Sequence, residues 1–164
     1  MNHLLRINQK IFSSFSECEE LIAGWKQKGD TIVFTNGCFD LIHEGHIIYL
    51  SKAASKGDHL LIGLNSDASV TRLKGASRPL LGQDTRALVL ASLFFVDGVI
   101  LFGEDTPENL IYQILPDYLV KGSDYRIDEI AGADIVFNHG GKVETIELIP
   151  DASTTSIINK IKAL

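Results

Sequence analysis

Cysteine is scarce in this chain, with two residues, Cys18 and Cys38, among 164. Two cysteines cannot form the disulfide framework of a small secreted scaffold. Residues 1–10 also lack the apolar core and the small-residue cleavage site that mark a secretory signal. We therefore expect a cytoplasmic protein.

Long hydrophobic runs and an excess of positive charge are missing as well. The longest apolar stretch, residues 87–96, is interrupted by Ser92 and is too short to cross a bilayer. The chain has 15 Lys and Arg against 21 Asp and Glu, a formal net charge of −6, so no broad basic surface indicates nucleic acid. We expect neither a membrane nor a nucleic acid as partner, and any anionic ligand must be bound by a local site.

The chain does contain enough apolar material for one core. Hydrophobic residues make up 45% and charged residues 22%, which excludes a disordered or low-complexity chain. A length of 164 residues is typical of one domain that buries about 70% of its unfolded surface. We expect a single domain over residues 1–164, in which residues 1–29 are an N-terminal extension with a helix and residues 30–164 form the main core.

Short apolar runs alternate with helical periods along the sequence. Strands are predicted at residues 31–35, 59–64, 99–102, 117–120 and 143–149. Helices are predicted at residues 16–28, 45–56, 84–96, 106–115, 131–139 and 153–164, and a short helix begins at Ser66-Asp67. This alternation predicts an α/β fold, a Rossmann-like three-layer sandwich with a parallel sheet of about five strands. Ligands of such sheets bind where the strands end, so a site is expected in the loops that follow the strands.

Local signals define several helix ends. Ser16-x-x-Glu19 matches a capping box for the first helix, and Gly29 predicts its end. Thr106-Pro107-Glu108 is typical of an N-cap, a proline at the first helical position and an acidic first turn. The predicted helix 84–96 is apolar nearly all round, so it is either buried in its own core or packed on a partner. We expect a homodimer that uses this region.

Two histidines follow the strand at residues 31–35, in the segment Asn36-Gly37-Cys38-Phe39-Asp40-Leu41-Ile42-His43-Glu44-Gly45-His46. Zinc-binding His-Glu-x-x-His motifs space their ligands at i and i+4, whereas His43 and His46 are three apart and no third ligand is evident, so no protein-held metal is expected. The other interpretation is anion binding, because imidazoles and helix N-terminal amides donate to phosphate oxygens and Gly45 allows close approach to the backbone. Helix capping alone also explains this segment.

Further polar groups are predicted at the same edge of the sheet. Ser153-Thr154-Thr155 begin the last helix, where one serine suffices as an N-cap but three hydroxyls suit a polyphosphate. Four cations, of which Lys121 is best placed after a strand, are alternatively solvated surface charges: Lys74, Arg78, Arg86 and Lys121. We interpret Cys38 as a small buried residue. Neither Gly-x-Gly-x-x-Gly nor a Walker A motif occurs, which disfavours a dinucleotide dehydrogenase and a P-loop kinase.

The segment from Thr35 to Asp40, His43-x-Gly45-His46 and Ser153-Thr154-Thr155 together resemble the cytidylyltransferase-like nucleotidylyltransferase superfamily. Over residues 11–164 the chain is similar to the D-glycero-β-D-manno-heptose 1-phosphate adenylyltransferases. The segments that carry this similarity are residues 64–69, 72–75, 77–79, 104–107 and 115–125. The resemblance implies in-line transfer of AMP from ATP to the sugar 1-phosphate, without a covalent intermediate. The products would be pyrophosphate and ADP-heptose for lipopolysaccharide, Mg²⁺ would be carried by ATP, and the enzyme would be the form that stands alone rather than fused to a sugar kinase.

The resemblance also implies residue roles. His43 and His46 would contact the ATP phosphates and stabilise the transition state, while Lys74 and Lys121 would neutralise phosphate charge. The implied nucleotide-binding residues are Thr35, Asn36, Gly37, Cys38, Phe39, His43, Gly45, His46, Lys121, Gly122, Asp124, Ser153, Thr154 and Thr155. The implied substrate-binding residues are Asn65, Lys74 and Arg78.

One departure from the family pattern is Asp151-Ala152, which stands before Ser153 where relatives usually have a glycine. Two other functions remain open. One is a cytidylyltransferase that acts on a small alcohol phosphate such as glycerol 3-phosphate. The other is a non-catalytic nucleotide-binding module, which the intact histidines and the Ser-Thr-Thr segment disfavour.

Overall fold

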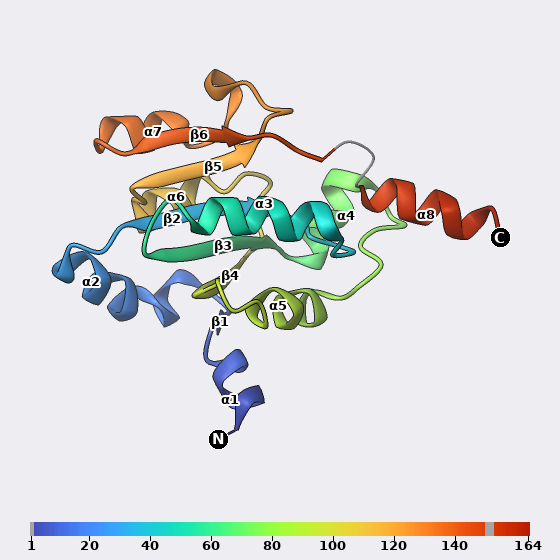
Figure 1. Cartoon of the computed structure of the whole chain (residues 1–164), viewed down its shortest axis with the longest axis horizontal. Helices are drawn as coiled ribbons and strands as arrows, with labels where there is room; N and C mark the ends of the chain where they lie inside the picture. Colours follow the sequence, from blue (N-terminus) through green and yellow to red (C-terminus); the bar gives the residue numbers. More distant parts are fainter. Residues whose placement is uncertain (1, 150–152) are drawn as a thin grey trace.

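A six-stranded sheet in which every neighbouring pair is parallel forms the centre of the molecule, in a computed structural model that describes residues 2–149 and 153–164. The strand order is β1-β4-β3-β2-β5-β6 (Figure 1). The strands are β1 (Ile11–Phe12), β2 (Ile32–Gly37), β3 (His59–Asn65), β4 (Gly98–Phe102), β5 (Tyr118–Gly122) and β6 (Lys142–Ile146). The predicted fold class and its five strands are confirmed. The sixth strand, β1, has two residues, too few to show a periodic pattern in the sequence.

Helices connect the strands and cover both faces of the sheet (Figure 1). They are α1 (His3–Asn8), α2 (Glu19–Lys28), α3 (Glu44–Ala54), α4 (Asp67–Lys74), α5 (Gln83–Ala91), α6 (Glu108–Ile114), α7 (Ala133–Asn138) and α8 (Thr154–Lys162). Within the described ranges, no helix is long and apolar enough to span a bilayer.

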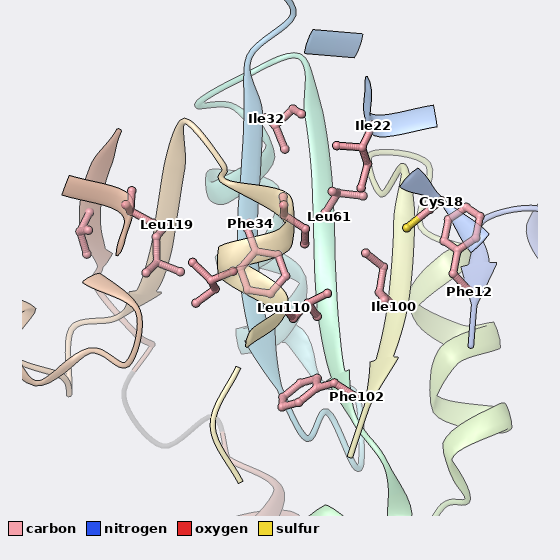
Figure 2. Packing of buried hydrophobic residues seen from close by; sticks show 14 of the residues in the cluster. Phe12, Cys18, Ile22, Ile32, Phe34, Leu61, Ile100, Phe102, Leu110 and Leu119 are labelled. Carbon is pink, nitrogen blue, oxygen red and sulfur yellow. The ribbon is translucent and has the colours of Figure 1, made fainter. Parts of the chain in front are cut away.

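Alternating strand residues supply two hydrophobic layers. On one face, Phe34 and Leu61 pack with Leu110 of α6 (Figure 2). On the other face, Val33 packs with Leu50 of α3 in a cluster that also contains residues of α5. Both faces are therefore dry, as a parallel sheet requires, and the three-layer prediction is confirmed.

The capping box predicted at Ser16-x-x-Glu19 does not form. Residues Phe15–Glu17 form a 3₁₀ turn, α2 begins at Glu19, and Cys18 at its N-cap makes no side-chain capping bond. The reason is packing: the Cys18 side chain is fully buried and its thiol donates to the Phe15 carbonyl at 3.3 Å, which holds the chain in the tight turn. The predicted end is confirmed, because Gly29 adopts a φ of 78° that favours glycine.

Two other helix ends differ from the prediction. Pro107 is the N-cap of α6 rather than its first residue, and Thr106 Oγ1 donates to Glu108 Oε2 at 3.3 Å instead of capping the helix. The helix predicted at residues 84–96 ends at Ala91, because the apolar residues that follow turn the chain into β4. Ala87 and Leu90 of this helix are buried in the core, whereas the apolar side chain of Leu88 is exposed at the surface.

Candidate active site

A cavity of about 630 Å³ lies at the carboxyl ends of the strands, where parallel sheets bind ligands. It brings together residues from the loops after β2, β3 and β5 and from the start of α8, which lies at this end of the sheet (Figure 1). All but one of the residues with a predicted role in binding or catalysis line it: Asn36, Gly37, Cys38, Phe39, His43, Gly45, His46, Asn65, Lys74, Arg78, Lys121, Gly122, Asp124, Ser153, Thr154 and Thr155. Arg86, the remaining candidate cation, does not line the cavity and is buried rather than solvated.

Thr35 is the exception, and its predicted contact with a nucleotide is wrong. Its side chain is fully buried, and its hydroxyl lies 2.7 Å from the Tyr49 hydroxyl. Tyr49 in turn donates to the Val120 carbonyl at 3.0 Å, which leaves Thr35 to donate to Tyr49. These bonds tie β2, α3 and β5 together beneath the cavity.

The two histidines form a close pair at the start of α3. Their ring centroids are 3.9 Å apart with the planes tilted by 31°, and the buried Nδ1 atom of each has no hydrogen-bond partner among the described residues. His43 occupies the N-cap position but its side chain makes no capping bond, so helix capping does not explain the motif. Buried polar atoms without partners are rare and costly, so these two nitrogens are candidates for hydrogen bonds to a ligand.

Burial decides the charge of these imidazoles. It lowers the pKa of His43, and burial together with the neighbouring His43 and Lys74 lowers the pKa of His46 to about 4. His46 is therefore neutral near pH 7 and keeps one N–H donor and one acceptor nitrogen. In the part of the chain that the structure describes, no group of three or more His, Cys, Asp or Glu is placed to hold a metal ion.

Lys121 is held at the floor of the cavity. Its Nζ donates to the Asn36 carbonyl at 3.2 Å and to Asn36 Oδ1 at 3.1 Å, and it lies 4.8 Å from the centre of the Tyr125 ring. Burial lowers the pKa of Lys121 to about 8, and the charge of Asp124 partly offsets this effect. Lys121 is thus a cation whose charge is sensitive to its surroundings.

A buried carboxylate, Asp40, joins the loop after β2 to the loop before α5. It accepts hydrogen bonds from the Leu80 and Leu81 amides at 2.8 and 3.0 Å and from Arg78 Nε at 2.6 Å. Burial alone would raise the pKa of Asp40, but these bonds hold the pKa below its usual value. Arg78 therefore lines the cavity while anchored to Asp40, whereas Lys74 is an exposed side chain at the rim.

The interpretation of Cys38 as a small buried residue is wrong. Cys38 is half-buried and lines the cavity, because the turn after β2 faces the ligand side; Cys18 is the buried cysteine. Asn65 lines the cavity too, but its Nδ2 donates to Ser69 Oγ at 3.0 Å. Sequence reasoning assigned no role to Asp40 or Tyr49, although Tyr49 follows His46 by one helical turn and so had a readable signal.

The hydroxyl segment caps α8 and lines the cavity. Ser153 Oγ accepts from the Ser156 amide at 3.0 Å and caps α8, while Thr154 Oγ1 donates to the Leu41 carbonyl at 3.3 Å. All three hydroxyl residues, Thr155 included, also line the cavity. The departure at Asp151-Ala152 lies outside the described residues.

A model of the family described as cytidylyltransferase-like matches residues 34–160, a range that contains every residue of the cavity. The chain belongs to the cytidylyltransferase-like family. Members of this family to which it is similar include the bifunctional protein HldE of Azotobacter vinelandii, 56% identical over 135 residues. HldE of Geobacter sulfurreducens is 54% identical over 141 residues. These matches cover 82% and 86% of this chain but 28% and 29% of the relatives, so the chain spans less than a third of their length.

Two solved structures resemble this member of the cytidylyltransferase-like family. The lipopolysaccharide core biosynthesis protein of Thermoplasma volcanium has a TM-score of 0.59 and 26% identity, over 74% of this chain and 98% of that chain. Pantoate-beta-alanine ligase of Francisella tularensis has a TM-score of 0.64 over 94% of this chain and 78% of that chain. Its identity is 16%, so this likeness shows the shared fold alone.

Proposed function

We propose that this chain transfers AMP from ATP to a sugar 1-phosphate, D-glycero-β-D-manno-heptose 1-phosphate, and releases ADP-heptose and pyrophosphate. The observation that carries the proposal is the close pair of His43 and His46, whose buried Nδ1 atoms have no partner among the described residues, in a cavity that Lys121 also lines. The motifs that resemble heptose 1-phosphate adenylyltransferases and the 49–56% identity to three proteins named HldE support the substrate assignment.

The chemistry needs no protein nucleophile. An oxygen of the sugar 1-phosphate forms a bond to the α-phosphorus of ATP, while the bond from that phosphorus to the bridging oxygen breaks and pyrophosphate leaves with the electron pair. A phosphate monoester is already ionised at neutral pH, so positioning and charge neutralisation supply the catalysis. His43 and His46 donate to oxygens of the reacting phosphates, Lys121 and Lys74 neutralise charge, and the Ser153–Thr155 hydroxyls hold the departing pyrophosphate.

Magnesium enters this scheme as part of the nucleotide substrate. Mg²⁺ prefers oxygen ligands and is commonly held through substrate phosphates with one or two protein carboxylates. The donor set fits this use: the described residues contain no cluster of three metal-binding side chains, whereas Asp105, Asp124 and Glu129 line the cavity as separate carboxylates.

We also propose the context in which the chain acts. Because the proposed substrate is ATP, we expect the chain to act in the cytoplasm. The pairing of β1 with β4 supports residues 1–29 as an extension of a single domain over 1–164 rather than as a separate unit. The 90% exposed side chain of Phe94 and the 37% exposed side chain of Leu88 support a homodimer through α5 and the turn after it.

The test is pyrophosphate release with Mg²⁺ and either ATP or CTP, across a panel of sugar 1-phosphates and polyol phosphates. We expect turnover with ATP and the heptose 1-phosphate. Turnover of CTP with glycerol 3-phosphate, and none with ATP and any sugar 1-phosphate, would instead identify a cytidylyltransferase. Nucleotide binding without pyrophosphate release from any pair would identify a non-catalytic binding module.

A further inference from the structure

Arg86 is a charged side chain in the core beside the cavity, yet it does not line the cavity. It is 1% exposed and donates from three nitrogens to three segments: Nε to the Leu81 carbonyl at 3.0 Å, Nη1 to the Cys38 carbonyl at 2.6 Å, and Nη2 to Asp67 Oδ1 at 2.8 Å. A buried guanidinium is costly unless its donors are matched in this way. This cost indicates that the three segments bound by Arg86 need to be held in place.

What Arg86 holds is the turn that carries the nucleotide motif. The Cys38 carbonyl belongs to the peptide that leads into Phe39, and Phe39 has a φ of +45°, a left-handed conformation that side chains with a Cβ rarely adopt. Such a conformation costs about 1–3 kcal/mol and persists only where the surroundings enforce it. The bond from Arg86 Nη1 fixes the Cys38–Phe39 peptide and so supplies that enforcement.

The Phe39 ring passes this constraint to the histidine pair. It is buried between Gly37 and His46: an ideal Cβ on Gly37 would lie 3.0 Å from the ring, and the His46 ring lies 5.3 Å away at 61°. The ring therefore forms one wall against which the His46 imidazole rests. A rotation of the Cys38–Phe39 peptide would move this wall.

We propose that Arg86 is a positioning residue that fixes the His46 imidazole through the Cys38 carbonyl and the Phe39 ring. Its effect on turnover rests on the proposed nucleotidyl transfer, but its effect on the His46 ring does not. Arg86 does not line the cavity, so it acts through the residues that it binds. Lysine cannot replace it, because one ammonium group cannot reach three acceptors on three segments.

The experiment compares Arg86→Met, Arg86→Lys and Phe39→Leu with the unmodified chain. Displacement of a reacting group by about 1 Å can cost about a hundredfold in rate, so we expect kcat to fall about 10- to 100-fold, with a smaller change in KM for ATP. The second readout is the NMR titration of the His46 imidazole in the absence of substrate. The groups that lower its pKa to about 4 besides burial, His43 and Lys74, stay unchanged, so a displaced Phe39 wall should raise the pKa toward about 6.5.

Leu90→Ala is the matched control, because Leu90 is a buried residue one turn further along α5. It should lower the Tm through a cavity while leaving kcat of the folded protein and the His46 titration unchanged. If the Arg86 variants fail to fold, Phe39→Leu alone still tests the wall. A His46 titration in folded Arg86 and Phe39 variants that matches the control overturns the proposal, even if the chain turns over ATP. If the unmodified chain turns over no combination of nucleotide and phosphate substrate, but the His46 titration is shifted in the variants, the proposed function is refuted and the positioning role of Arg86 stands.

Discussion

The neutral state of the histidines determines what they can do in the site. A neutral imidazole offers one donor without bringing a positive charge that would have to be desolvated in the empty cavity. Burial keeps His46 in this state, since its pKa is lowered to about 4. The fixed positive charge that phosphates require must then come from other side chains that line the cavity, such as Lys121 and Arg78.

Replacement of either histidine tests whether the pair acts on the transition state. We expect His43→Ala and His46→Ala each to lower kcat by at least about a hundredfold, with a much smaller change in KM for ATP, because preorganised donors to developing charge act mainly in the transition state. The Tm should change little, since the Nδ1 atoms have no hydrogen-bond partner among the described residues to lose. The double variant should lose less than the product of the single losses. Near-normal kcat in either folded variant would remove the histidines from the mechanism.

The pH dependence of ATP binding tests Lys121. A lysine is cationic below its pKa, so Lys121, whose pKa is about 8, loses charge as the pH rises from 7 to 9, while an ordinary lysine with a pKa near 10.4 stays charged. We expect the Kd for ATP to rise with pH above 8, by up to about tenfold per pH unit. Lys121→Arg should abolish this slope and Lys121→Met should weaken binding at every pH. A slope that survives in the arginine variant would assign it to another group.

At the scale of elements, the turn between β2 and α3 is the critical part. It leaves little room for a side chain at Gly37, since a Cβ there would lie 3.0 Å from the Phe39 ring and the ring would have to shift. We expect Gly37→Ala to press the Phe39 ring toward His46, to weaken ATP binding and to destabilise the fold by about 1–3 kcal/mol. Calorimetry measures both effects.

Gly24→Ala is the control for that substitution. Gly24 lies within α2, where an added Cβ would meet nothing within 4 Å, so helix propensity predicts a gain in stability of up to about 1 kcal/mol. ATP binding should be unchanged. Equal effects of the two glycine substitutions on ATP binding would refute the role of the turn.

Helices and strands were largely predictable because each buries an apolar stripe whose period is visible in the sequence. Helix starts were less predictable. Ser16 and Thr106 have the residue types of N-caps, yet the burial of Cys18 and the φ-restricted Pro107 place α2 and α6 elsewhere. These local choices depend on packing between distant segments, which single-sequence patterns do not contain.

At the scale of the whole molecule, the proposed dimer makes a specific prediction. Phe94 is 90% exposed, so Phe94→Ser removes an apolar side chain that a partner would bury without disturbing the core. We expect light scattering at micromolar concentration to give a dimer for the unmodified chain and a shift toward monomer for this variant. Phe137→Ser, at a half-exposed phenylalanine of α7, should leave the dimer intact. A monomeric unmodified chain would contradict the proposal.

Many of the residues that line the cavity were predictable, because parallel strands end at one edge of the sheet. This rule brought His43, Lys121 and Thr154 together although more than a hundred residues separate the first from the last. It could not distinguish side chains that face the cavity from those beneath it. Thr35 is beneath it because β2 alternates its side chains between two buried layers, and the partners of Arg86 come from two loops and the first residue of α4.

Transfer of an isotope label tests the central claim most directly. The chain is incubated with ATP, Mg²⁺ and D-glycero-β-D-manno-heptose 1-phosphate whose phosphate oxygens carry ¹⁸O, and the products are analysed by mass spectrometry. Attack by the sugar phosphate on the α-phosphorus predicts ADP-heptose that retains the label, including the bridging oxygen, together with unlabelled pyrophosphate. Labelled pyrophosphate, or no ADP-heptose under conditions in which ATP binds, would contradict the assigned reaction.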